Sequence, residues 1–171
     1  MTKPKILIIE VLFLFTNAYF TFTSAQNLGA YSDYRDRFFI FDSGRNVKAE
    51  DFLVQSFKIG GTCILYVNNQ GHLKIYNDGQ IVKLESGGIS AYHATDYLAA
   101  YNVYEKLIVL EGLNPVVLSY RCPYYDVQDS LIVFYDKNIE SLRVYYNGTI
   151  EDIESGMLGD PAFRLRSGDN I

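Results

Sequence analysis

The sequence has 171 residues, of which 49% belong to the hydrophobic set and 20% are charged. This composition is typical of a folded domain and excludes a disordered tail or a membrane bundle. The formal net charge of −5 leaves no basic surface for DNA, RNA or anionic lipid, so we expect none of these as a partner. The content of 15 Tyr and 11 Phe beside 4 Pro and no Trp favours half-buried strands. We therefore expect an all-β protein.

The first 25 residues have the pattern of a secretory signal peptide. Two lysines precede an apolar run over residues 6–15, and a stretch of small residues ends at Ala25. We expect cleavage between Ala25 and Gln26, which predicts a mature protein that is secreted, periplasmic or held at the cell surface. Two alternatives stay open. One is an uncleaved membrane anchor over residues 6–22, although Glu10 interrupts it, and the other is an ordinary N-terminal strand.

A repeat of about 35 residues runs through the remaining residues, 26–171. Four strand-like segments end 35, 34 and 35 residues apart, and a glycine follows each one. The segments are Phe38–Phe41, Leu73–Tyr76, Leu107–Leu110 and Leu142–Tyr145, followed by Gly44, Gly79, Gly112 and Gly148. Glycine in these positions supplies the positive φ of a tight hairpin turn. Each segment is therefore predicted to turn back into a second strand.

Two more strands complete each predicted repeat. The second strands are expected to end at Ala49, Leu84, Leu118 and Ile153, and the third strands to contain Phe57, Tyr92 and Tyr125. The fourth strands begin at Leu28, Cys63, Leu98 and Leu131. Within them Tyr31, Tyr66, Tyr101 and Phe134 occupy one column, at spacings of 35, 35 and 33. A recurring large aromatic in a strand is interpreted as a packing position.

Four short antiparallel strands, repeated several times, resemble the blades of a β-propeller. The resemblance is architectural and covers residues 28–171, with repeats at about 38–72, 73–106, 107–141 and 142–171, and with strand 28–32 completing a blade. No motif of a particular propeller subfamily is present. A β-trefoil, with three repeats, fits poorly. An open meander of stacked hairpins stays possible, because a sequence period does not reveal whether a ring closes.

The ends of the repeat allow two interpretations. In the first, strand 28–32 pairs beside Phe163–Leu165 and closes a ring of four blades, which removes the open strand edge. In the second, the chain is the front part of a longer propeller. A truncated array would expose a sheet face and strand edges and would tend to aggregate.

No residue pattern points to catalysis, a cofactor or a metal. Cys63 and Cys122 fall in apolar columns of different repeats and are predicted to be buried free thiols rather than a disulfide. His72 and His93 have no partner at metal-ligand spacing. No hydrolase, phosphate-binding or zinc motif appears. We therefore predict no catalytic residue, cofactor or metal site in this sequence.

Several polar residues have a structural interpretation. Asp96, Asp129 and Asp169 recur at one repeat position, where turn formation is the simpler account and a cation site at one rim is the alternative. The acidic residues between 151 and 160 lack the ligand order of a calcium loop. Asn147 begins a glycosylation sequon, but Asn-Gly also forms a preferred hairpin turn.

Tyrosines near strand ends are the candidate binding residues, because amphipathic rings suit sugars and peptides. They are Tyr34, Tyr97, Tyr104 and Tyr124. The resemblance to propellers, the signal segment and the missing catalytic pattern together predict an exported, non-catalytic binding or scaffold module for a protein or glycan. The alternative is the N-terminal part of a propeller-type hydrolase or lyase that acts on an extracellular polymer.

Overall fold

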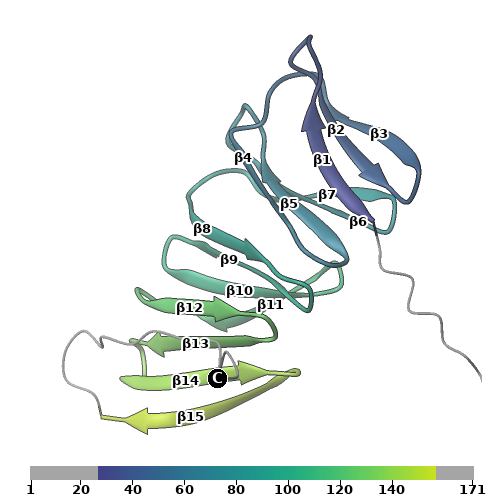
Figure 1. The fold of residues 1–171 in the computed structure, drawn as a ribbon. Coiled ribbons are helices and arrows are strands. Elements are labelled where there is room, and N and C mark those ends of the chain that lie inside the picture. The colour runs from purple at the N-terminus through teal and green to yellow at the C-terminus, as the bar shows by residue number, and fades with distance from the viewer. Residues whose placement is uncertain (1–26, 157–171) are drawn as a thin grey trace, which may run out of the picture.

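A computed structural model describes residues 27–156, which form fifteen strands in four antiparallel sheets (Figure 1). These residues contain no helix, and thus none that could cross a membrane. The prediction of an all-β protein built from short antiparallel strands is confirmed. We number the sheets 1 to 4 in chain order.

Sheet 1 has three strands among the described residues and the others have four. Sheet 1 comprises β1 (Leu28–Ser32), β2 (Phe38–Asp42) and β3 (Arg45–Glu50). Sheet 2 comprises β4 (Ser56–Ile59), β5 (Cys63–Val67), β6 (Leu73–Asn77) and β7 (Gln80–Glu85). Sheet 3 comprises β8 (Ile89–Ala94), β9 (Ala99–Val103), β10 (Lys106–Glu111) and β11 (Asn114–Ser119). Sheet 4 comprises β12 (Tyr125–Gln128), β13 (Leu131–Asp136), β14 (Ser141–Tyr146) and β15 (Thr149–Ser155).

The boundaries of the sheets differ from those of the repeats predicted from the sequence. The predicted repeats begin at the strand before the glycine turn, whereas sheets 2 to 4 begin at β4, β8 and β12, the predicted third strands. The difference arises because a period can be divided anywhere and only the pairing fixes where a sheet starts. Strand β1 pairs with β2 in sheet 1. The ring-closing pairing with residues 163–165 lies outside the described residues.

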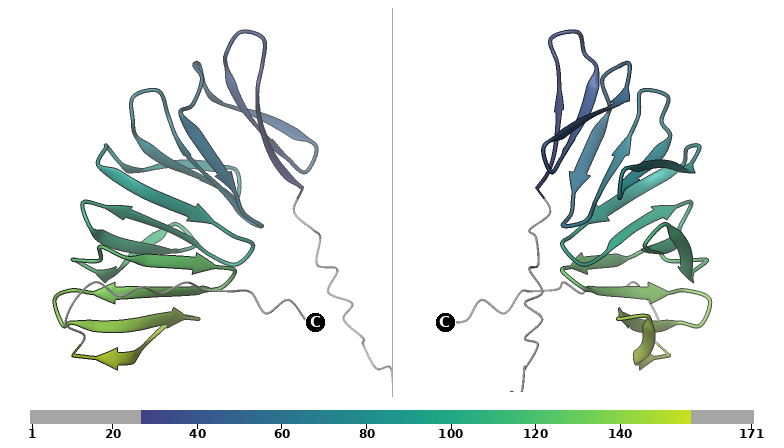
Figure 2. Two further views of the ribbon diagram at one scale, coloured as in Figure 1. Left: turned by 60° about the vertical axis from the view of Figure 1, so that its left-hand side comes forward. Right: turned by 90° about the vertical axis from the view of Figure 1, so that its right-hand side faces the viewer.

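The four sheets follow one another in a curved array that is not closed into a ring (Figures 1 and 2). Among sheets 1 to 3, the backbone contacts between sheets involve β1, the first two strands of sheet 2, and β8. Strand β8 lies against β4 and β5, and β1 lies against β4 and β5 from the other side. The first strands of sheets 2 and 3 therefore bound the space between those sheets.

Glycine turns set the hairpin that joins the last two strands of each sheet. In three hairpins both central residues have positive φ, as type I′ turns require: Ser43–Gly44, Asp78–Gly79 and Asn147–Gly148. In the fourth, between β10 and β11, Gly112 holds φ 65° at the first central position, which suits a type II′ turn. All four predicted glycine turns are confirmed.

The core consists of three apolar layers, one between each pair of neighbouring sheets. Alternate residues of a strand point to opposite faces, so one strand serves two layers. In β5, Cys63, Leu65 and Val67 pack toward sheet 3, while Ile64 and Tyr66 pack toward sheet 1, and all five are buried. Because a single sheet of this size cannot bury its own faces, the fold depends on contacts between sheets.

Tyrosine hydroxyls join neighbouring sheets across these layers. The Tyr66 hydroxyl of sheet 2 donates to Glu50 Oε1 of sheet 1 over 3.0 Å, and Tyr101 of sheet 3 donates to Glu85 Oε1 of sheet 2 over 3.3 Å. Lys74 Nζ also contacts Glu50 Oε1, at 2.6 Å. Burial and the neighbouring carboxylate raise the pKa of both phenols. The hydroxyls therefore stay protonated and act as donors.

A second column of tyrosines makes the same kind of bond near the glycine turns. Tyr76 donates to Asp42 Oδ2 over 2.6 Å and Tyr145 donates to Glu111 Oε1 over 3.2 Å. Burial, and then the bond to Asp42, raises the pKa of Tyr76 to about 12. The packing role predicted for the Tyr66 column is confirmed for Tyr66 and Tyr101, which are 0% and 1% exposed.

Tyr31, in the same column as Tyr66, departs from the prediction. Its side chain is 43% exposed, because its face of sheet 1 has no further sheet against it among the described residues.

We predict that Tyr66→Phe lowers the free energy of unfolding by about 1–2 kcal/mol, because it removes one buried hydrogen bond to a carboxylate without changing the ring volume. Urea unfolding measures the change. The control is Tyr120→Phe, whose hydroxyl belongs to a side chain that is 71% exposed and whose removal is expected to change stability by less than about 0.5 kcal/mol. Equal losses in the two variants would contradict a role for the inter-sheet bond.

Candidate functional site

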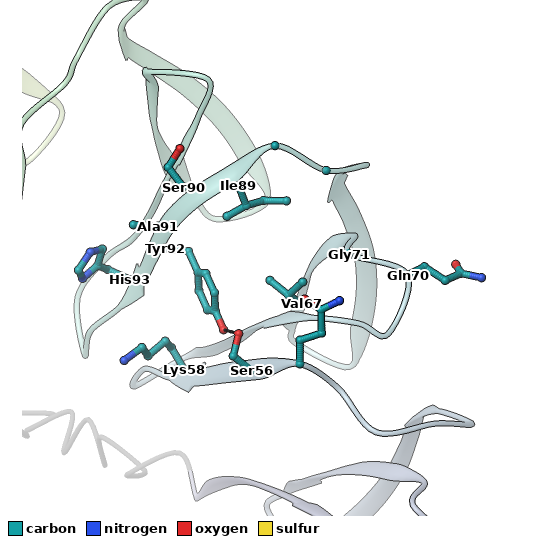
Figure 3. Close-up of a pocket in the computed structure, with 13 residues that line it drawn as sticks. Ser56, Lys58, Val67, Gln70, Gly71, Ile89, Ser90, Ala91, Tyr92 and His93 are labelled. Carbon is teal, nitrogen blue, oxygen red and sulfur yellow. Dashed lines mark hydrogen bonds between the residues drawn. The ribbon is translucent and has the colours of Figure 1, made fainter.

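A pocket of about 650 Å³ lies between sheets 2 and 3. This size is within the range of small-molecule sites. Its walls come from strands β4 and β8 and from the turns that precede β6 and β8. Figure 3 shows Lys58 and His93 at one end, Gln70 and Gly71 at the other, and Tyr92 between them.

A hydrogen bond between the two walls crosses this pocket. The Tyr92 hydroxyl on β8 donates to Ser56 Oγ on β4 over 2.6 Å (Figure 3). Burial raises the pKa of Tyr92, and the bond to Ser56 opposes that rise. The phenol is therefore neutral at neutral pH and donates the hydrogen bond that joins the two strands. Val67 and Ile89 supply the apolar part of the lining.

Lys58 and His93 both lie at the left-hand end of the pocket in Figure 3. The pKa of His93 is lowered, first by burial and then by the Lys58 charge, while Asp126 opposes the shift. His93 also packs edge-on against Tyr125, with ring centroids 5.6 Å apart. A lowered pKa leaves the imidazole neutral at pH 7, where it can donate one hydrogen bond and accept another.

The pocket offers hydrogen bonding with little charge. Lys58 is the only Lys, Arg, Asp or Glu in its lining, and Lys58 forms no salt bridge within residues 27–156. Hydroxyls and amides provide the remaining polar groups, from Gln55, Ser56, Gln70, Ser90 and Tyr92. With no carboxylate in the lining, this pocket has no pair of acids for general acid and base chemistry.

The turn before β8 brings one of the predicted tyrosines to the edge of this pocket. Gly88 holds φ 73° and lies so close to the Tyr104 ring that a Cβ at position 88 would be 2.2 Å from it. The Tyr104 backbone N–H also donates to the Gly88 carbonyl over 3.3 Å. A side chain at position 88 would therefore displace Tyr104, whose ring is 79% exposed.

The four predicted tyrosines do not form one cluster. Tyr97 precedes β9 and Tyr104 follows it, so the five residues of the strand, about 17 Å, separate them. Tyr34 lies in the turn between β1 and β2, and Tyr124 directly precedes β12. Tyr97 lines a second hollow, of about 600 Å³, between sheets 3 and 4.

The cysteines match their prediction. Both are free thiols, buried in different apolar layers. Burial raises the pKa of Cys63 to about 11, and burial together with nearby carboxylates raises that of Cys122 to about 12. Neither thiol is therefore a nucleophile at neutral pH.

The remaining predicted positions fall in turns or beyond the described residues. His72 closes the β5–β6 turn, where its N–H donates to Asn68 Oδ1 over 2.9 Å. Asp129 has φ 47°, and its carbonyl accepts from the Thr95 hydroxyl. Within residues 27–156 no group of three or more His, Cys, Asp or Glu could hold a metal ion. Asp169 and the cleavage site at Ala25 and Gln26 lie outside the described residues.

Sequence reasoning missed the pocket between β4 and β8. Its polar residues are spread over two sheets, and no linear motif joins Lys58 to Tyr92. The sequence does contain one indication of this pocket, in β4. The β4 segment, Ser56–Ile59, carries a serine and a lysine where the equivalent β8 residues include Ala91 and His93, and it is exposed along its whole length.

Repeated antiparallel sheets that stack face to face through three similar layers define a propeller-like repeat protein. The comparison with family models agrees, because the model described as a 10-bladed beta propeller domain matches residues 22–171. The chain belongs to this family. The match begins at residue 22, so it includes residues 22–25, the last four residues of the predicted signal peptide.

Two designed proteins are among the solved structures that match. The crystal structure of the computationally designed Ika8 protein is 16% identical at a TM-score of 0.43, over 76% of this chain and 46% of that chain. The crystal structure of the computationally designed Ika4 protein is 14% identical at a TM-score of 0.41, over 71% of this chain and 86% of that chain. The chain thus spans less than half the length of the Ika8 chain. A search of curated proteins found no match.

Proposed function

We propose that this protein is an exported, non-catalytic binding module and that the pocket between β4 and β8 is its binding site. The observation that carries the proposal is the lining of this pocket, which combines hydroxyls, amides and a neutral imidazole with one lysine, Lys58, that forms no salt bridge to any of residues 27–156. Sugars present hydroxyls that such groups can both donate to and accept from. Lys58 adds a point charge that suits one carboxylate.

The ligand class that fits best is therefore an acidic glycan. Val67 and Ile89 offer apolar contact for the face of a sugar ring, while Gln70 and Ser90 lie in the same lining. Lys58 stands at one end of the pocket (Figure 3), which places the carboxylate of the ligand there. A neutral glycan keeps the hydrogen bonds and loses the charge-assisted contact.

Catalysis has less support. The alternative of a propeller-type hydrolase or lyase requires two carboxylates, or a histidine with a carboxylate, in one pocket. The lining between β4 and β8 contains His93 but no carboxylate, and Asp126, which acts on the pKa of His93, is not part of the lining. We therefore propose binding rather than polymer cleavage for this pocket.

Isothermal titration with a tetramer of galacturonic acid and with a neutral galactose tetramer tests this proposal. The acidic tetramer is expected to bind more tightly, and Lys58→Met is expected to weaken its binding about tenfold or more, because one charge-assisted hydrogen bond is lost. The matched control is Lys83→Met, an exposed lysine on β7 that is not in the lining. Equal affinity of the two tetramers, or equal affinity of Lys58→Met and the parent protein, would refute the acidic-glycan assignment.

Export rests on the signal-like segment before Gln26. We propose that the mature protein begins at Gln26 and is secreted, periplasmic or held at the cell surface. Intact mass of the protein produced with its own N-terminus checks this. A product that lacks residues 1–25 and leaves the cytoplasm is expected, and an unprocessed product that stays inside the cell would contradict export.

A further inference from the structure

The two terminal sheets each have one face that no other sheet covers within residues 27–156. Sheets 2 and 3 contribute to apolar layers on both faces, whereas sheet 1 packs only against sheet 2 and sheet 4 only against sheet 3. Because the sheets repeat, each position on an uncovered face has an equivalent that faces a neighbouring sheet elsewhere in the chain. Those equivalents indicate which surface each uncovered face fits.

The uncovered face of sheet 1 carries exposed aromatic rings. Tyr31 is 43% exposed and Phe41 is 38% exposed, whereas their equivalents in sheet 2, Tyr66 and Tyr76, are 0% and 1% exposed. Tyr31 stacks on Phe39, with centroids 5.5 Å apart and planes 12° apart. This face thus carries aromatic rings at the same two positions as the face that sheet 2 buries against sheet 1.

The uncovered face of sheet 4 exposes apolar side chains at two of the matching positions, and it carries the exposed carboxylate of Glu151 where sheet 3 has Val116. Ile153 is 55% exposed, but Leu118, its equivalent in the bulge of sheet 3, is 5% exposed. Leu142 is half-buried, while its equivalent Leu107 is fully buried. At Ile153 and Leu142, sheet 4 therefore presents the apolar positions that, in sheets 1 to 3, pack against the next sheet along the array.

Glu154, on this face, occupies the same strand position as the carboxylates that accept hydrogen bonds between the inner sheets. In each sheet, the residue after the bulge in the last strand pairs with the first residue, or the second in sheets 3 and 4, of the neighbouring strand. These pairs are Glu50–Phe38, Glu85–Leu73, Ser119–Leu107 and Glu154–Leu142. Glu50 and Glu85 accept the hydroxyls of Tyr66 and Tyr101. Glu154 is exposed.

The tyrosine that matches Glu154 is on the opposite end of the array. Tyr31 belongs to the Tyr66 column, and its hydroxyl donates to Asn46 of its own sheet over 3.3 Å rather than to a carboxylate of another sheet. Glu154 and Tyr31 are thus an acceptor and a donor of the type that joins the inner sheets. One copy cannot bring them together while the array is open (Figure 2).

We propose that copies of this chain associate head to tail, with the uncovered face of sheet 4 in one copy packed on the uncovered face of sheet 1 in the next. The Tyr31 hydroxyl then donates to Glu154 across the junction, and Phe41 and Ile153 become buried. The junction continues the interface already present three times within each chain. Such a heterologous contact extends to a closed ring or an open filament, and it does not depend on the proposed ligand.

Sedimentation velocity of the full chain over a range of concentrations tests the association. The parent protein is expected to form species of two or more copies. Phe41→Arg and Ile153→Arg should each weaken association at least tenfold, because each places an unpaired charge in the apolar junction. Ile139→Arg, at a 51% exposed turn position, is the control and should associate like the parent. A parent protein that stays monomeric up to its solubility limit would overturn the proposal.

Mixing the two variants distinguishes this junction from a symmetric one. Phe41→Arg retains an intact sheet 4 face and Ile153→Arg retains an intact sheet 1 face, so the mixture is expected to form a dimer that neither variant forms alone. Recovery in the mixture also shows that both variants are folded. Association of Ile153→Arg alone, or of Phe41→Arg alone, as strong as that of the parent would contradict the head-to-tail geometry.

The Tyr31–Glu154 contact has its own test. Tyr31→Phe and Glu154→Gln should each raise the dissociation constant about five- to tenfold, which corresponds to one hydrogen bond to a carboxylate. Because both remove the same contact, the double variant should bind no more weakly than the weaker single variant. Additive losses would show that the two side chains do not meet.

Discussion

The whole structure depends on one constraint, that the inner strands must be buried on both faces at once. A sheet of four short strands has too little area to form a core by itself. In β5 and β9 every residue is buried, because alternate side chains pack into different layers. A change at one residue of these strands therefore affects one layer directly, and a change of strand register would affect two.

The tyrosine–carboxylate hydrogen bonds between sheets recur at equivalent positions of the repeat. Where one of these bonds is missing, both its donor and its acceptor are replaced. Where the Tyr66 column holds Phe134, the equivalent of Glu50 is Ser119. Where the Tyr76 column holds Leu110, the equivalent of Asp42 is Asn77. A buried carboxylate without its donor is costly, so donor and acceptor change together. At the ends of the array, sheet 1 retains the donor, Tyr31, and sheet 4 retains the acceptor, Glu154. The proposed junction between copies is based on this pair.

The strands, the glycine turns and the buried thiols could be predicted from the sequence because local pattern determines them. Gly44 and Gly79 stand where the backbone needs positive φ, and a 35-residue period locates the strands. The exposure of Tyr31 could not be predicted, since it depends on whether another sheet covers that face. The pocket between β4 and β8 could not be predicted either, because the pairing of Tyr92 with Ser56 arises only when two repeats pack together.

The most direct test of burial on both faces is native-state hydrogen exchange, resolved by residue, in the two middle sheets. Only amides that are hydrogen-bonded within a sheet are compared. We expect the amides of β5 and β9 to exchange at least tenfold more slowly than those of the last strands, β7 and β11, because exchange in β5 and β9 requires separation of two layers. Equally slow exchange in β7 and β5 would contradict the view that contacts between sheets, rather than pairing within a sheet, hold this protein together.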